Sequence, residues 1–151
     1  MNKIVIFFVL IFADIISKHF VKNNLILNQS VEINDFLYLV YIQNFGVSFG
    51  LFAGSIPYYL LIIIGLLIVI LIIYLMYLSK NTLEKSAYFI IIIGALSNIL
   101  DRLFNTFVVD FISLRYESFY WPAFNLADIY ITIGIIMLII SFLNNKKLTN
   151  E

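Results

Sequence analysis

The sequence predicts an all-α membrane protein of four transmembrane helices, with one small β-element outside the membrane. Of its 151 residues, 63% are hydrophobic and only 12% are charged, whereas a soluble domain is about 45–50% apolar and about 25% charged. A core of this size cannot hide so much apolar surface, so lipid must cover much of it. About 20 apolar residues cross a bilayer, and such runs occupy about residues 4–22, 57–78, 86–104 and 126–143.

The first run could be mistaken for a signal peptide, because Lys3 precedes it. A signal peptide has a clean apolar core and a small-residue cleavage site. Here Asp14, Lys18 and His19 interrupt the second half of the run, and no such site follows. We therefore interpret it as a retained transmembrane helix. The second run carries no charge, and Pro57 suits its first helical position, where the missing N–H is not needed.

The segment between the first two helices has a different composition. Phe36–Ile42 is aromatic and branched, which favours a short strand. Gly46, Gly50 and Gly54 follow it and favour turns and close backbone approach. We predict a small β-like element here. No internal repeat or linker divides the chain, so residues 1–151 are expected to form a single domain.

Composition also excludes several classes of function. The chain has no cysteine and one histidine, which rules out a cysteine nucleophile, disulfides and a histidine-rich metal site, and argues against a Ser-His-Asp triad. We expect no metal and no cofactor. Net charge is zero, and no clustered basic face suggests nucleic-acid binding.

The distribution of basic residues predicts the topology. If the N-terminus is cytoplasmic, the cytoplasmic segments carry Lys3, Lys80, Lys85, Lys146 and Lys147. The opposite loops carry only Lys22 and Arg115, with Arg102 at their edge. This bias favours four spans with both termini in the cytoplasm.

Charged residues near the membrane gather at the outer level of these spans, around the segment Val109–Asp128 between the last two helices. Asp110 and Asp128 lie near its ends. Two carboxylates in contact share one proton, so one acts as base and the other as acid, and such a pair can activate water. The alternative is two structural aspartates, since an acid in the first turn of a helix is favoured by the dipole. Spacing alone does not decide between these interpretations.

Two further groups of charges have structural and functional interpretations. Asp14 and Lys18 share one helix face. They could support a site, contact a lipid headgroup, or neutralise each other while Lys18 reaches the interface. Asn98, Asp101 and Arg102 also project to one side of a helix. They could form a bundle-stabilising network or take part in chemistry, with Arg102 binding Asp101, a phosphate or a carbonyl.

Single residues are less informative by themselves. Asn44 suits an ordinary turn, and Asn125 could cap the last helix or bind substrate backbone. Gly94 is more typical of close helix packing than of a direct functional role. His19 suits the membrane interface better than catalysis.

Taken together, five motifs resemble those of the lipoprotein signal peptidases, also called signal peptidase II. They are Asp14–Lys18 (DIISK), Asn44–Gly50 (NFGVSFG), Gly94–Arg102 (GALSNILDR), Val109–Phe111 (VDF) and Phe124–Asp128 (FNLAD). They follow the family's order and span nearly the whole chain.

The resemblance implies a bacterial membrane aspartic peptidase that cuts diacylglyceryl-modified prolipoproteins just before the lipidated cysteine. It implies catalytic roles for Asp110 and Asp128, and a monomer in the inner membrane that a globomycin-like cyclic peptide could inhibit. It also implies an outer β-cradle over about 31–54 and a short helix within 113–120. The positions expected to shape or support the site are Asp14, Lys18, Asn44, Gly94, Asn98, Asp101, Arg102, Asn125 and Ala127.

Two other functions fit membrane-embedded charges. A small transporter would place ionisable groups near the bilayer midplane at broken helices, but here they cluster towards one face. A non-catalytic assembly factor could use the outer loop for docking. A flux assay would detect the transporter, and a pull-down without proteolysis would favour the assembly factor.

Overall fold

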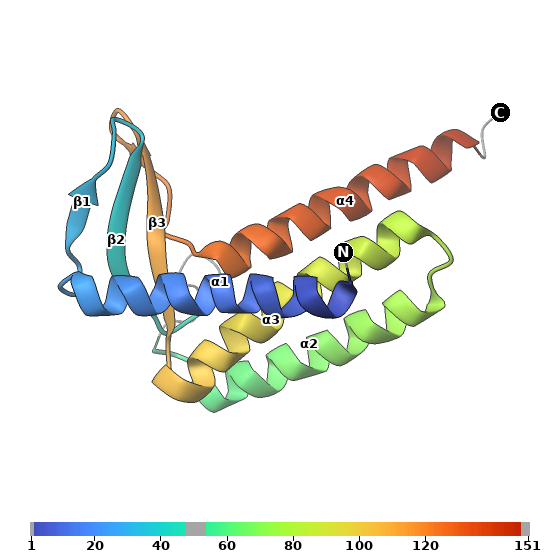
Figure 1. The fold of residues 1–151 in the computed structure, drawn as a ribbon, viewed down its shortest axis with the longest axis horizontal. Helices are drawn as coiled ribbons and strands as arrows, with labels where there is room; N and C mark the ends of the chain where they lie inside the picture. The colour runs from blue at the N-terminus through green and yellow to red at the C-terminus, as the bar shows by residue number, and fades with distance from the viewer. Residues whose placement is uncertain (1, 48–53, 149–151) are drawn as a thin grey trace.

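The computed structural model describes residues 2–47 and 54–148. It contains four long helices, α1 (Lys3–Asn24), α2 (Tyr58–Leu78), α3 (Thr82–Asn105) and α4 (Leu126–Leu148). All four are long and apolar enough to cross a membrane, so the four predicted apolar runs are confirmed as helices that could span one. α1 begins and α4 ends at the end of the bundle that lies away from the sheet (Figure 1).

Two helix boundaries differ slightly from the prediction. α2 begins at Tyr58, so Pro57 occupies the N-cap position and not the first helical position. α4 continues to Leu148 instead of ending near residue 143.

The start of α3 needs a larger correction, because its first turn was expected to be loop. Asn81 caps the helix by accepting a hydrogen bond from the Leu83 N–H over 2.8 Å. Glu84 lies in the first turn, where an acid is favoured by the helix dipole. Its carboxylate also accepts a hydrogen bond from Ser141 Oγ over 3.0 Å. These polar residues therefore tie the start of α3 to α4.

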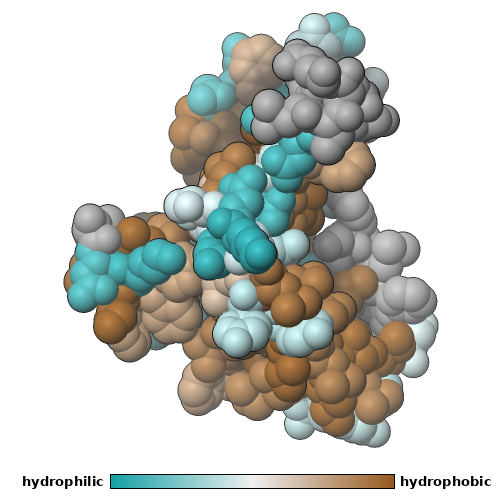
Figure 2. Space-filling model, turned by 90° about the vertical axis from the view of Figure 1, so that its right-hand side faces the viewer, coloured by the Kyte–Doolittle hydropathy of each residue, from teal (hydrophilic) through white to brown (hydrophobic). Residues whose placement is uncertain are grey.

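The bundle is organised around α3, which carries buried residues along most of its length. Ile92 and Ile99 pack against Ile62 and Val69 of α2 in one apolar core. Most other side chains of α2 are exposed and apolar, as expected for a surface covered by lipid. Figure 2 looks at the end that lacks the sheet: hydrophilic residues gather there, and hydrophobic residues cover much of the bundle around them.

A four-stranded antiparallel sheet lies across the other end of the bundle (Figure 1). Its strands, in spatial order, are β1 (Ser30–Glu32), β2 (Leu37–Asn44), β3 (Val108–Tyr116) and β4 (Phe119–Tyr120). The predicted strand is confirmed as most of β2. The expected cradle over 31–54 is only half of the sheet, and its residues 48–53 lie outside the described part.

The prediction for the segment between α3 and α4 was wrong. The expected short helix within 113–120 is absent from these described residues, which form β3, a turn and β4. β3 pairs along β2, from Leu37 opposite Leu114 to Asn44 opposite Val108. This pairing across distant sequence, which local charge patterns do not reveal, makes the protein four helices plus a sheet.

The sheet is fastened to the bundle by a small apolar core. Val21, near the end of α1, packs with Tyr41 of β2 and with Val109 and Phe111 of β3. At the end of α3, Thr106 adopts a left-handed conformation with φ 69°, which turns the chain into β3. The start of β3 is thereby held beside the ends of α1 and α3.

Candidate active site

Asp110 and Asp128 lie on either side of Asn125, at the end of the bundle that carries the sheet. Asp110 belongs to β3, and Asp128 to the first turn of α4. The Asn125 side-chain amide donates to Asp110 Oδ1 over 2.7 Å, and its backbone N–H donates to Asp128 Oδ2 over 3.2 Å. Asn125 Oδ1 also accepts from the Asp128 N–H over 3.1 Å, so the predicted helix cap is confirmed.

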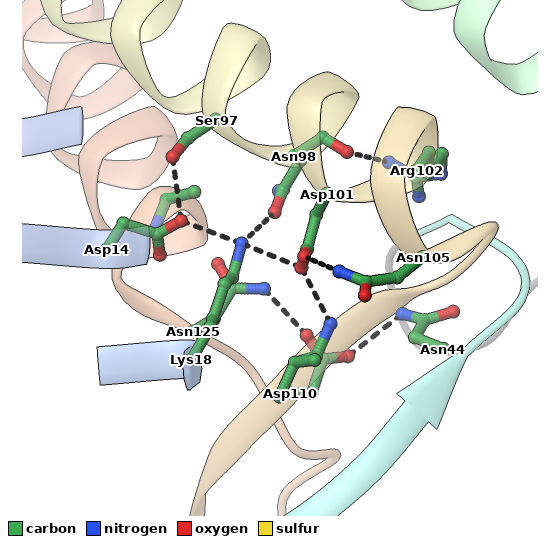
Figure 3. A network of polar contacts seen from close by, with 12 residues as sticks. Asp14, Lys18, Asn44, Ser97, Asn98, Asp101, Arg102, Asn105, Asp110 and Asn125 are labelled. Carbon is green, nitrogen blue, oxygen red and sulfur yellow. Dashed lines mark hydrogen bonds and ion pairs between the residues drawn. The ribbon is translucent and has the colours of Figure 1, made fainter. Parts of the chain in front are cut away.

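Two further asparagines bind the remaining oxygens of the pair. Asn44, at the end of β2, donates to Asp110 Oδ2 over 2.9 Å (Figure 3). Asn98 of α3 donates to Asp128 Oδ1 over 2.9 Å. Within the described residues no ion pair reaches either carboxylate. Amide donors fix the position of a carboxylate without removing its charge, so both groups remain able to exchange protons.

A second pair of carboxylates, Asp14 and Asp101, shares one lysine instead. Lys18 Nζ lies 2.7 Å from Asp14 Oδ2 and 3.3 Å from Asp101 Oδ2 (Figure 3). Asp14 is fully buried, and its Oδ1 accepts from the Ala127 N–H over 2.9 Å. The same lysine donates to Asn98 Oδ1 over 2.9 Å. This cluster therefore supports Asn98 and the start of α4, and with them Asp128.

Arg102 binds a carbonyl, which was one of its predicted roles, and no side-chain hydrogen bond or ion pair joins it to Asp101 in the described structure. Its Nη2 donates to the Gly46 carbonyl over 2.6 Å and its Nη1 to the Asn98 carbonyl over 3.2 Å. The buried Nε meets no acceptor among the described residues. Arg102 thus holds the chain that follows β2 and keeps one donor free.

Sequence reasoning gave no role to two polar residues of α3. Ser97 Oγ donates to Asp14 Oδ2 over 2.7 Å, and Asn105 Nδ2 donates to Asp101 Oδ1 over 2.7 Å. Their spacing of four from Asp101 on either side could have revealed them as one polar face.

The carboxylate pair opens into a cavity of about 670 Å³ between α2, α3, α4 and the sheet. Its polar lining at the sheet end is Asn44, Asn98, Arg102, Asp110 and Asp128. The rest is mostly apolar, with Gly65 and Ile68 on α2 and Ile131 and Ile135 on α4 among its walls. A largely apolar cavity with convergent polar groups at one end suits an amphipathic ligand.

The single histidine lies outside this site. His19 is exposed, and its Nε2 lies 2.8 Å from Asn23 Nδ2. Over the described ranges, no three histidine, cysteine, aspartate or glutamate side chains come together as metal ligands would.

Comparison with known proteins gives this arrangement its context. The family model of signal peptidase (SPase) II matches residues 6–144. The chain belongs to the signal peptidase II family. It is 39% identical to the lipoprotein signal peptidase of Actinobacillus succinogenes, over 91% of this chain and 88% of the relative. It is also 39% identical to the lipoprotein signal peptidase of Fusobacterium nucleatum, over 97% of this chain and 90% of the relative. The resemblance inferred from the motifs is confirmed, and the chain is a membrane-spanning protease.

Two solved structures of bacterial membrane enzymes, both obtained by the in meso method, share the fold of this signal peptidase II. The first has a TM-score of 0.85 at 28% identity, over 95% of this chain and 88% of the other. The second has a TM-score of 0.80 at 29% identity, over 93% and 92%.

In this signal peptidase II, the surroundings of Asp110 hold its proton more firmly than water would. Burial raises the pKa of Asp110 to about 6, and the nearby charge of Asp128 adds to the rise. Hydrogen bonds from Asn44 and Asn125, together with the charge of Lys18, act in the opposite direction. A carboxyl group with such a pKa can give and take protons near neutral pH.

Gly94 is a packing residue, as its sequence context indicated. A Cβ there would press on the Ala127 carbonyl oxygen and lie 2.8 Å from Ile131 Cγ1. We expect Gly94→Ala to cost about 1–3 kcal/mol of stability through overpacking. Gly65→Ala is the matched control, because its Cβ would meet only the flexible Ile99 side chain. Thermal unfolding of both variants in detergent checks this; equal losses would contradict it.

Proposed function

We propose that Asp110 and Asp128 form the catalytic dyad of a lipoprotein signal peptidase that hydrolyses diacylglyceryl-modified prolipoproteins just before the lipidated cysteine. The observation that supports this best is the contrast between the two carboxylate pairs. Asp14 and Asp101 share Lys18, whereas Asp110 and Asp128 are held by amides alone at the polar end of a cavity.

The reaction requires one ionised and one protonated carboxyl. The ionised carboxylate accepts a proton from water as the water oxygen attacks the carbonyl carbon of the scissile peptide bond. The protonated carboxyl then gives its proton to the leaving nitrogen when the carbon–nitrogen bond breaks. One water is consumed, and no covalent intermediate with the enzyme forms.

The remaining site residues position the substrate or the dyad. Arg102 lines the cavity, and its guanidinium group suits a carbonyl of extended substrate backbone, which has no water to bind at membrane depth. Asn44, Asn98 and Asn125 hold the carboxylates, and the apolar walls suit the diacylglyceryl chains and the signal peptide. A cyclic lipopeptide of the globomycin kind would compete for the same cavity.

The charge bias predicts how the protein lies in the inner membrane of the bacterium. With both termini in the cytoplasm, the sheet and the dyad face outwards, where the prolipoprotein is delivered. We propose that the enzyme acts as a monomer.

The substrate class is tested by a gel-shift assay with the purified protein in detergent. A prolipoprotein is supplied with and without its diacylglyceryl group, with a globomycin-like peptide as inhibitor. We expect cleavage of the lipidated form only, blocked by the peptide. If a folded protein cuts neither form, the proposal fails, and flux and pull-down assays would test the transporter and docking alternatives.

The pKa of Asp110 predicts the pH dependence. Because the charge of Asp128 contributes to the raised value, that value describes loss of the last proton of the dyad. As the pH rises through about 6, Asp110 loses its proton and with it the acid for the leaving nitrogen. We therefore expect kcat/KM to fall as the pH rises through this region.

Asn44→Ala should move the fall in kcat/KM to higher pH, because the Asn44 amide stabilises the ionised form of Asp110. Asn23→Ala, on the exposed side of α1, is the control and should leave the pH at which kcat/KM falls unchanged. Initial rates across a pH series measure both. If kcat/KM of Asn44→Ala falls at the same pH as that of the wild type, or at a lower pH, this account is contradicted.

A further inference from the structure

A second, smaller crevice of about 240 Å³ lies between α1 and α3, separate from the main cavity. The two hollows meet different faces of α3. Ser97, Asp101 and Asn105 line the crevice, whereas Asn98 and Arg102 line the main cavity. Catalysis as proposed above leaves the crevice without a function.

The crevice combines polar and apolar walls in the manner of a lipid site. Lys22, His19 and Asn105 supply polar groups near the sheet end of the helices. Ile15 and Leu100 lie about one turn or more further into the bundle, where acyl chains would run. Both helices are candidate membrane spans, so the polar part lies at the depth of lipid headgroups.

Lys22 is the residue of the crevice whose positive charge is available to an anion. Lys18 also lines the crevice but is already held by two carboxylates, Asp14 and Asp101. Lys22 is exposed and forms no ion pair with any described residue. Its Nζ donates instead to Asn105 Oδ1 over 2.6 Å, which holds the ammonium group against the crevice.

We propose that this crevice binds one anionic phospholipid, with the phosphate at Lys22 and Asn105 and an acyl chain along Ile15 and Leu100. A headgroup without a cation of its own fits best, because a choline group would bring a second positive charge towards Lys22. A lysine near the membrane surface attracts an anionic headgroup in this way.

The site is also connected to the dyad by hydrogen bonds. Asn105, which receives the Lys22 bond, donates to Asp101, and Asp101 contacts Lys18. Lys18 donates to Asn98, which in turn donates to Asp128. A phosphate bound at Lys22 and Asn105 therefore acts on one end of a chain whose other end orients a proposed catalytic group.

Native mass spectrometry of the delipidated protein tests the site without using catalysis. The protein is titrated with phosphatidylglycerol, with phosphatidylcholine, and with phosphatidylglycerol in the presence of inorganic phosphate. We expect one tightly bound phosphatidylglycerol, weaker phosphatidylcholine, and no displacement by inorganic phosphate. Equal affinity for the two lipids, or displacement by free phosphate, would overturn the assignment.

Variants locate the binding on the molecule. Lys22→Gln should weaken phosphatidylglycerol binding about fivefold, and Lys22→Arg should preserve it. Lys3→Gln, an exposed lysine at the other end of α1, is the matched control and should bind as the wild type does. If Lys22→Gln and Lys3→Gln bind the lipid equally well, the crevice is not the site.

Discussion

Replacing either Asp110 or Asp128 with asparagine is expected to lower the rate of prolipoprotein cleavage by about 10³-fold. Asparagine has nearly the shape of aspartate but cannot accept the proton from water or supply one to the leaving nitrogen. Each variant therefore loses the chemistry, while its amide oxygen can still accept one of the two hydrogen bonds that the aspartate accepts. The measurement is the single-turnover rate with a lipidated substrate.

These variants should stay folded, which separates a catalytic from a structural role. Two buried carboxylates held by amides repel each other, and neutralising one removes this repulsion and its desolvation cost. The expected unfolding temperature is therefore equal to that of the wild type or higher. Asp35→Asn, in the exposed turn before β2, is the control and should change neither rate nor stability. Cleavage at the wild-type rate by a folded Asp110→Asn or Asp128→Asn protein would refute the dyad.

Replacing Lys18 should have the largest effect on stability. Lys18→Met leaves the carboxylate of Asp14, which is fully buried, without its cation, and also removes the lysine that forms an ion pair with Asp101. Breaking a buried ion pair from one side costs about 3–5 kcal/mol. We expect a loss of this size in the free energy of unfolding, measured by denaturation in mixed micelles.

A double variant shows whether the lost charge is the cause. Lys18→Met with Asp14→Leu removes the stranded charge as well, so it should be more stable than Lys18→Met alone. Lys3→Met, at an exposed position of the same helix, controls for the loss of a lysine. If Lys18→Met unfolds like Lys3→Met, the buried cluster contributes nothing to stability.

The parts of the fold predicted from sequence are those with local signals. Four apolar runs gave the four helices, and alternating aromatic and branched residues gave β2. β3 was missed because its partners lie far away in sequence: Ile112 lies opposite Leu39. This segment was interpreted as the surroundings of Asp110, although Val108–Tyr116 suits a strand well.

For the candidate site, sequence supplied the residues but not their partners. The pairing of Asp14 with Lys18 followed from helical spacing, whereas the contact of Lys18 with Asp101 required the fold. Nothing local showed that Asn125 would join Asp110 to Asp128, or that Ser97 would bind Asp14. The mechanism depends on the difference between a carboxylate pair that shares a lysine and a pair held by amides alone, and only the structure shows this difference.

The most direct test of the central claim is a mass spectrum of a quenched single turnover, run in water labelled with heavy oxygen. Direct hydrolysis by water held between Asp110 and Asp128 predicts one heavy oxygen in the new carboxyl end of the signal peptide. That end should be the residue just before the lipidated cysteine, and the mass of the enzyme should not change. An enzyme carrying the mass of the signal peptide, or a cut at another bond, would contradict the account.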